Sequence, residues 1–325
     1  MFFNDFIRGI KPNLASSSVS AYASNLSMFF PHVTTEKSLR AELTMANIKT
    51  IVAYLTESYA SPSTRGLKLN SLIIVLKYLF GDSSEMYIFV SKKRDECNQN
   101  YTENASKKQF TEKDSQNFVS TEEYRKMLDT WEPTVKSLMA QTKIKRTEFN
   151  QIQEFYLATF YFYKALRADL ENTHVVFTKD VPADTSKNYV HVHGKSITII
   201  LNQYKTSKTY GQNTIEITGE GYDKILPYLN YLKNKTGENE PIVLFLSKDG
   251  KKAITASQLS QLYSSIFIQR LHKKFTITLN RKRIISSNPD LVQYEEAQKK
   301  VTKLTREMGT SVNMAQNVYQ KKSKK

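Results

Sequence analysis

The sequence predicts a mostly helical protein with a small antiparallel β-sheet, organised in two domains. Apolar residues recur at helical spacing over residues 1–90 and again over most of residues 118–325. A polar stretch with almost no aliphatic side chains, residues 91–117, separates these two regions. Alternating and β-branched residues are concentrated at positions 189–218, which predicts that the strands lie there.

Helical patterns fill residues 1–90, which we expect to form a small all-helical domain. One pattern follows a serine-rich cap region at residues 16–20. Another covers residues 45–58, where apolar side chains form a single stripe. A third begins at the break around Pro62 and stops at Gly81.

Residues 91–117 are rich in Lys, Asn, Gln and Ser, and we expect them to form a polar linker or solvated loop. The single cysteine, Cys97, lies in this stretch and is expected to be inert. One cysteine excludes an intrachain disulfide framework and every multi-cysteine zinc module, and it fits a reducing compartment.

The pattern resumes at Ser120, a hydroxyl cap with acidic residues in the turn that follows. The long apolar and aromatic run Phe149–Arg167 predicts a helix that is buried on most sides. Three antiparallel strands are expected next, at Tyr189–Gly194, Ser196–Tyr204 and Asn213–Thr218. Further helical patterns cover Asp223–Asn234, Ala256–Lys273, Asp290–Met308 and Asn313–Gln320.

The charge balance favours a polyanionic partner. The chain has 47 Lys and Arg against 31 Asp and Glu, a net charge of +16, so nucleic acid is the expected partner. No apolar run approaches the ~20 residues of a membrane span, and the N-terminus lacks the pattern of a signal peptide. We therefore expect an intracellular protein, in the nucleus or the cytoplasm, with no membrane partner.

Motifs for metals and cofactors are missing from the sequence. His191 and His193 lie two apart on an expected strand, which is weak support for a zinc site without further ligands. Gly219 and Gly221 form a turn without a dinucleotide or P-loop motif. We therefore expect neither a metal nor a cofactor.

Breaking a DNA phosphodiester without a metal sets clear chemical demands. Guanidinium groups must stabilise the extra negative charge of the phosphorane, and the planar fork of arginine can grip two oxygens. A lysine can protonate the leaving 5′ oxygen. A tyrosine can act as the nucleophile and conserve the bond energy in a covalent link.

Four segments occur in the order that such chemistry needs. Ala165-Leu166-Arg167 follows the aromatic run, and Tyr204-Lys205-Thr206-Ser207-Lys208 lies in the expected hairpin. Leu279–Ser287 reads LNRKRIISS, and Leu304–Tyr319 reads LTREMGTSVNMAQNVY. The set resembles the tyrosine recombinases (integrases), with their A-L-R segment, K-T-G-K hairpin, H-x-x-R box and L-G-H-S-(x)7-Y end. The resemblance covers nearly the whole chain.

The resemblance implies a role for each matching residue. The phosphate-binding arginines would be Arg167 and Arg283, the proton donor Lys205 and the nucleophile Tyr319. Asn280 and Thr310 occupy positions where the family carries His and His or Trp, and they would supply hydrogen bonds. The family's acid, three residues after the first arginine, is replaced by Leu170.

Two of these assignments have alternatives. Arg281 offers another register for the second arginine; Arg283 is preferred because Asn280 then falls three residues before it and Ile284 to Ser287 follow it. Lys208 rivals Lys205. The remaining cations are expected to contact DNA phosphates: Lys208, Arg281, Lys282, Lys273 and Lys274.

The resemblance also implies the architecture, activity and partners. Residues 1–90 would be the core-binding domain that clamps DNA, residues 91–117 the linker and residues 118–325 the catalytic domain. The chain would be a site-specific recombinase of a virus or mobile element, acting as a homo-tetramer on two DNA duplexes. The alternatives are a catalytically degenerate DNA-binding protein of the same fold and a strand-relaxing activity like that of type IB topoisomerases.

Overall fold

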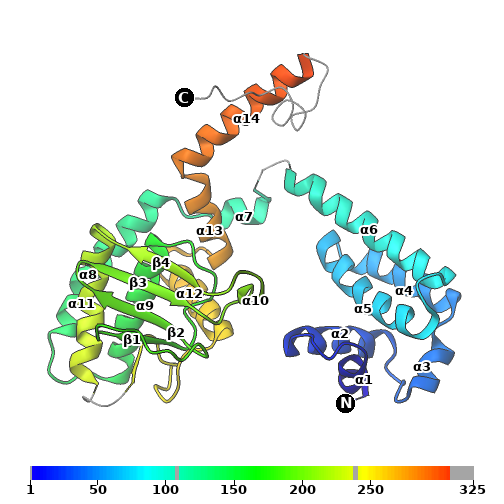
Figure 1. Cartoon of the computed structure of the whole chain (residues 1–325), viewed down its shortest axis with the longest axis horizontal. Coiled ribbons are helices and arrows are strands. Elements are labelled where there is room, and N and C mark those ends of the chain that lie inside the picture. Colours follow the sequence, from blue (N-terminus) through cyan, green and yellow to red (C-terminus); the bar gives the residue numbers. More distant parts are fainter. Residues whose placement is uncertain (1, 107–109, 237–240, 308–325) are drawn as a thin grey trace, which may run out of the picture. The chain divides into compact units, whose positions relative to one another are not determined.

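The computed structural model describes residues 2–106, 110–236 and 241–307. The chain divides into two compact units, Met1–Phe110 and Thr111–Lys325, which are described separately. Figure 1 shows both units, with helices predominating and one small sheet confined to the second. The mostly helical class with a small sheet, predicted from the sequence, is confirmed.

The first unit is helical throughout its described residues. Its helices are α1 (Phe2–Ile10), α2 (Ser16–Phe29), α3 (Glu36–Glu42), α4 (Met45–Ser58), α5 (Pro62–Phe80) and α6 (Glu85–Ser106). Side-chain caps fix the N-termini of α4 and α5. The Thr44 side chain accepts a hydrogen bond from the backbone N–H of Asn47, and the Ser61 side chain accepts one from that of Thr64. Gly81 caps the C-terminus of α5 with φ +82°, a conformation that glycine adopts without the Cβ penalty.

Most of the residues expected to form a polar linker are helical, which corrects that prediction. Helix α6 runs through Ser106 and packs along α5, and α7 (Glu112–Asn117) follows. Val90 and Cys97 are buried against the first unit's core, so Cys97 does not lie in a loop. Arg94 donates to Asn70 of α5 at 3.2 Å. The apolar stripe of α6 is narrow and its other faces are polar. Apolar periodicity in the sequence therefore did not indicate this helix.

The second unit contains the remaining described helices around one sheet. These are α7, α8 (Thr121–Met139), α9 (Arg146–Tyr163), α10 (Ser207–Tyr210), α11 (Glu220–Lys235), α12 (Ala256–Leu271), α13 (Ile277–Ser286) and α14 (Pro289–Glu307). Helix α9 is the central element, since α8, α11, α12 and α13 all contact it and most of its side chains are buried. It stops at Tyr163, before the expected end at Arg167.

The sheet of the described chain has five strands in the order β4-β3-β2-β1-β5. They are β1 (Thr173–Val176), β2 (Asn188–His193), β3 (Ser196–Leu201), β4 (Asn213–Ile217) and β5 (Ile242–Val243). The three expected strands are β2, β3 and β4, and they pair antiparallel as predicted. The sheet is mixed rather than purely antiparallel, because β1 pairs parallel with β2. Strands β1 and β5 are too short to show a period in the sequence.

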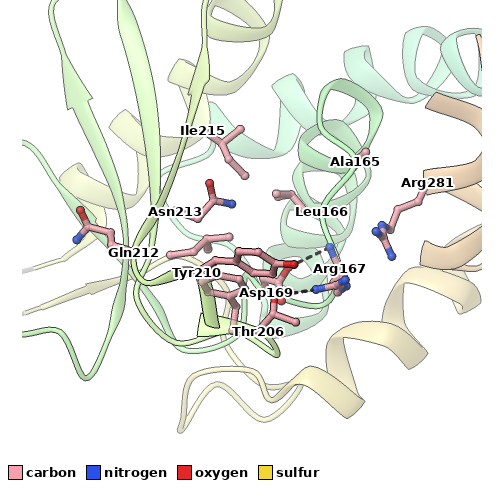
Figure 2. A pocket seen from close by; sticks show the side chains of 12 residues that line it. Ala165, Leu166, Arg167, Asp169, Thr206, Tyr210, Gln212, Asn213, Ile215 and Arg281 are labelled. Carbon is pink, nitrogen blue, oxygen red and sulfur yellow. Dashed lines mark hydrogen bonds between the residues drawn. The ribbon is translucent and has the colours of Figure 1, made fainter. Parts of the chain in front are cut away.

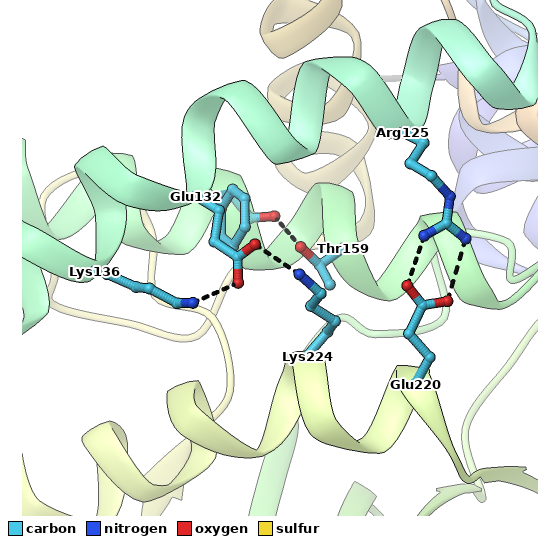
Figure 3. A network of polar contacts seen from close by, with 7 residues as sticks. Arg125, Glu132, Lys136, Thr159, Glu220 and Lys224 are labelled. Atoms are coloured by element: carbon cyan, nitrogen blue, oxygen red, sulfur yellow. Dashed lines mark hydrogen bonds and ion pairs between the residues drawn. The ribbon is translucent and has the colours of Figure 1, made fainter.

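Ion pairs connect α8 to α11 on the outside of this core (Figure 3). Arg125 of α8 contacts Glu220 of α11 at 2.6 Å. Glu132 of α8 contacts Lys224 of α11 at 2.6 Å and Lys136 of its own helix at 3.0 Å. Among the described residues, no helix has the length and apolar character needed to span a membrane.

Candidate active site

A pocket of about 460 Å³ lies where three parts of the second unit meet. The segment after α9 contributes Arg167 and Asp169, the connection between β3 and β4 contributes Thr206 and Tyr210, and α13 contributes Arg281. Figure 2 shows Arg281 extending toward Arg167, with Thr206 and Tyr210 on the hairpin side. Residues more than a hundred positions apart thus converge on one cavity.

Arg167 is held by contacts to its backbone and its side chain. Its backbone N–H donates to Asp169 Oδ2 at 3.2 Å, and its carbonyl accepts from the hydroxyl of buried Tyr161. Its Nη1 donates to Thr206 Oγ1 at 3.5 Å. A guanidinium carries five N–H donors in a rigid fork, so a half-buried arginine fixed in this way is suited to bind an anion in the pocket.

Arg281 brings a second guanidinium to the same cavity from α13. Its Nε is buried, and among the described residues it has no hydrogen-bond partner. A buried donor without a partner carries a desolvation cost of about 1–3 kcal/mol. Two positively charged side chains, Arg167 and Arg281, therefore line the cavity.

Arg283, the preferred second arginine in the sequence analysis, lies inside the protein and not in this pocket. Its side chain is 4% exposed. Its guanidinium donates to Asn280 Oδ1, Thr121 Oγ1 and the Phe162 carbonyl, each at 3.0 Å. Burial lowers the pKa of Arg283, and its charge lies 5.0 Å from the ring centroid of Tyr124. This expectation is therefore corrected, since the guanidinium is occupied by the core.

Asn280 is also part of the core, which corrects its expected place beside the reacting phosphate. It is fully buried and donates from Nδ2 to the Tyr161 carbonyl at 2.6 Å. The reason is helical geometry: each residue advances about 100°, so Arg281 and Arg283 point to nearly opposite faces of α13. Of the two arginines, Arg281 lines the pocket and Arg283 does not.

Asp169 places a carboxyl group beside the two arginines. Burial raises its pKa, although the backbone N–H of Arg167 and the charges of Arg167 and Arg281 oppose the shift. In the sequence, Asp169 stands directly before Leu170, the residue at the position of the family's acid. A carboxylate only two residues after Arg167 is the sequence signal that could have pointed to Asp169.

The two lysines expected to act from the hairpin are close in sequence to pocket residues, but they do not line the pocket. Lys205 and Lys208 are both exposed, on either side of Thr206, which does line it. The role of Lys205 as proton donor, with Lys208 as its rival, stays a prediction from the sequence. Tyr210 was missed by the sequence analysis, although it is the one aromatic residue among polar ones in the turn KTSKTYGQN.

The other expected DNA-contacting lysines have partners within the second unit. Lys273 pairs with Glu123 at 2.8 Å and Lys282 with Asp114 at 2.6 Å. Lys274 is exposed, and its backbone N–H donates to Asn117. Lys273 and Lys282 therefore each form an ion pair with a carboxylate of the same unit. Thr310 and Tyr319 lie outside the described residues.

The histidine pair on β2 does not gather further metal ligands. The rings of His191 and His193 stack at 5.7 Å, and His191 Nε2 lies 2.9 Å from the Thr178 carbonyl. Within the described ranges, no three His, Cys, Asp or Glu side chains are placed to hold one metal ion.

Comparison with known proteins gives only distant structural likeness. No protein-family model and no curated protein matches the chain. The chain is similar to a solved structure described as the crystal structure of XerA recombinase, over 90% of this chain and 85% of that one. The sequence identity is 13% and the TM-score is 0.33. At these values the function has to be argued from the residues themselves.

Proposed function

We propose that this chain binds double-stranded DNA and cuts and rejoins its strands through a covalent phosphotyrosine link, as a site-specific recombinase. One observation carries this function: Arg167 and Arg281 converge from separate elements on a single pocket. Two guanidinium groups around one cavity form a site for a phosphodiester and for the extra charge of its phosphorane. The net charge of +16 supports a DNA partner.

The chemistry assigns a role to each group. The Tyr319 hydroxyl gives up its proton to solvent and attacks phosphorus, so that an Oη–P bond forms as the P–O5′ bond breaks. Lys205 donates a proton to the departing 5′ oxygen, while Arg167 and Arg281 stabilise the phosphorane. A 5′-hydroxyl of the partner strand then attacks the phosphotyrosine and releases Tyr319. One ester replaces another at each step, so neither ATP nor a redox partner is needed.

The other residues that the resemblance singled out have two kinds of proposed role: some contact the phosphate, and others stabilise the helix that carries Arg281. Thr310 stays proposed as a hydrogen-bond donor to the phosphate. Asn280 and Arg283 support α13, because their polar groups are bonded to one another and to α9. Exposed Lys208 and Lys274 would contact the DNA backbone. A homo-tetramer on two duplexes, with the first unit clamping DNA, remains part of the proposal.

A second candidate is a DNA-binding protein of the same fold that does not cut. The observation that favours it is Asp169, because a carboxyl group in the pocket opposes phosphate binding whenever it is ionised. The residue three positions before Arg281 is Thr278 and not the family's histidine, which points the same way. A third activity, strand relaxation like that of type IB topoisomerases, would use the same pocket and the same covalent step.

The deciding experiment traps the covalent intermediate. The full chain is incubated with a pool of end-labelled duplexes that carry a nick, from which the freed 5′ fragment diffuses away, and is then run on a denaturing gel. We expect a labelled protein–DNA adduct that is lost in Tyr319→Phe and kept in Tyr294→Phe. Tyr294 is a matched control because it is an exposed tyrosine, 60% accessible, on α14.

The alternatives predict different results. Binding in a gel shift without any adduct would contradict cleavage and favour the non-cutting DNA-binding protein. An adduct that persists in Tyr319→Phe would show that another residue is the nucleophile. Relaxation of supercoiled plasmids regardless of sequence would favour the topoisomerase-like activity over the recombinase.

A further inference from the structure

Tyr210 has an unusual position at the rim of the arginine pocket. Its side chain is 75% exposed, the largest exposed fraction among the exposed large apolar side chains of the described chain. The ring nevertheless lines the same cavity as Arg167 and Arg281. Among the described residues, its hydroxyl has no hydrogen-bond partner and its ring has no aromatic neighbour. An aromatic face is therefore available next to two guanidinium groups.

The local backbone fixes where this ring lies. Tyr210 ends the short helix α10, and its N–H donates to the Thr206 carbonyl at 3.1 Å. Gly211 follows with φ +70°, a conformation that suits glycine, and its N–H donates to the Ser207 carbonyl at 2.8 Å. The turn thus holds Tyr210 on the same side of the cavity as Thr206, which itself accepts from Arg167 (Figure 2).

The groups around the cavity match the parts of a nucleotide. Arginine forks bind phosphate oxygens, and an aromatic face binds a base by stacking. Asn213 of β4 adds an amide to the same wall, and amides can hydrogen-bond the edge of a base. The volume of about 460 Å³ lies in the range of sites for small ligands.

We propose that Tyr210 stacks on the DNA base next to the phosphate that Arg167 and Arg281 hold, and so positions that phosphate. The occupant is a nucleotide whose base is unstacked from its neighbour, since a base inside a continuous stack has no free face. This inference rests on the proposed function and adds a base contact to the same site. Stacking tolerates every base, so Tyr210 would contribute affinity and position rather than sequence readout.

The test uses the full chain and two small probes. One is the 3′,5′-bisphosphate of 2-aminopurine deoxyriboside, followed by its fluorescence. The other is abasic deoxyribose 3,5-bisphosphate, measured by competition against the first. Loss of a stacked aromatic corresponds to about 5- to 150-fold in affinity, so we expect the unmodified chain to prefer the base-bearing probe by that factor. Tyr210→Phe should keep the preference and Tyr210→Leu should abolish it.

Two controls separate this inference from the proposed function. Arg281→Ala should weaken both probes, whereas Tyr210→Leu should leave the abasic probe unchanged. Tyr294→Leu, which removes an exposed tyrosine elsewhere, should change neither. Equal affinity for both probes, with both still dependent on Arg281, would overturn stacking while leaving the phosphate site intact. Failure of both probes to bind, or binding that ignores Arg281, would overturn the pocket and the inference together.

The adduct assay distinguishes stacking from a reactive hydroxyl. In the nicked-duplex experiment, Tyr210→Phe keeps the ring and removes only the oxygen. We expect it to form adduct at close to the unmodified rate, whereas Tyr210→Leu should form it more slowly. Loss of the adduct in Tyr210→Phe would make the hydroxyl itself a reacting group and would overturn the stacking role.

Discussion

Arg283 donates from Nε to Oδ1 of Asn280 at 3.0 Å, and this buried pair ties α13 to the end of α9. Asn280 donates in turn to the Tyr161 carbonyl at 2.6 Å, and the Tyr161 hydroxyl donates to the carbonyl of Arg167. One chain of hydrogen bonds therefore connects the helix that carries Arg281 to the segment that carries Arg167. The two guanidinium groups of the pocket are held relative to each other through the core.

Replacing Arg283 should lower stability. In Arg283→Met, the Asn280 Oδ1 and Phe162 carbonyl lose a buried donor, which costs about 1–3 kcal/mol in the free energy of unfolding. Urea unfolding measures this loss. Lys282→Met is the matched control, because Lys282 is an exposed neighbour in an ion pair and such pairs contribute at most about 1 kcal/mol. Equal stability of Arg283→Met and the unmodified chain would contradict this account of α13.

The register of α13 predicts where a histidine fits. With Arg281 in the pocket, the position three residues before it is Thr278, which is exposed, and not the fully buried Asn280. Asn280→His should destabilise the chain by about 1–3 kcal/mol, because the core has no room for a larger ring. Thr278→His should stay within about 0.5 kcal/mol of the unmodified chain. Thermal unfolding of both variants measures these losses of stability. A larger loss in Thr278→His than in Asn280→His would instead favour the register in which Arg283 is the second arginine.

Periodicity in the sequence predicts much of this fold. Helices α2, α4 and α5, the aromatic helix α9 and the antiparallel strands β2 to β4 all follow from apolar spacing. The helix over the polar stretch was missed, because only the narrow stripe containing Val90 and Cys97 packs on α5. Strands β1 and β5 were missed because they have four and two residues.

The site is less predictable, because it depends on which face of a helix points inward. Arg167 could be chosen from its segment, but Arg281 and Arg283 are both arginines in a basic run. Matching a family motif favoured Arg283, whereas burial of its apolar neighbours fixes the rotation of α13. Tyr210 and Thr206 reach the pocket through the path of a turn, which periodicity does not describe. Tyr319 and Thr310 remain predictions from the sequence.

Asp169 should make DNA binding depend on pH. Burial raises its pKa, so the carboxyl becomes neutral as the pH falls through that raised value, and repulsion of a phosphate disappears. The affinity of the unmodified chain for a short duplex should therefore rise toward acid pH. Asp169→Asn should bind more tightly at neutral pH, by about fivefold if the repulsion is ~1 kcal/mol.

Comparing the unmodified chain with Asp169→Asn isolates the Asp169 carboxyl, because every other group is the same in both proteins. Fluorescence anisotropy from pH 4 to pH 8 at constant salt gives the ratio of affinities. We expect the ratio to shrink toward one at the acid end. A constant ratio across the range would mean that the carboxyl of Asp169 does not face the bound phosphate.

Glu132 should contribute stability that is lost in acid (Figure 3). Burial would raise its pKa, but hydrogen bonds from Lys224 and Lys136 outweigh this and hold the pKa below its ordinary value of 4.5. A depressed carboxyl pKa gives stability above the unfolded value, which is lost as the pH falls through the folded one. Glu132→Gln should cost about 1 kcal/mol at pH 7 and nothing at the acid end.

The control for Glu132 is the neighbouring ion pair. Glu220 contacts Arg125 on the same two helices, but its side chain is 49% exposed. Glu220→Gln should therefore cause a smaller loss at pH 7 than Glu132→Gln. Urea unfolding at pH 7 and at acid pH measures the free energy of unfolding of each variant. A larger loss in Glu220→Gln than in Glu132→Gln would contradict the expectation that the more buried ion pair contributes more.

The rate of adduct formation by Arg281→Ala tests the central claim most directly. Under single-turnover conditions on a nicked duplex, removing one phosphorane-stabilising donor should slow the step by about 10²–10³-fold. The variant should unfold at the same urea concentration as the unmodified chain and should still shift DNA on a native gel. Adduct formation by Arg281→Ala at the unmodified rate would contradict the assignment of Arg167 and Arg281 to the scissile phosphate.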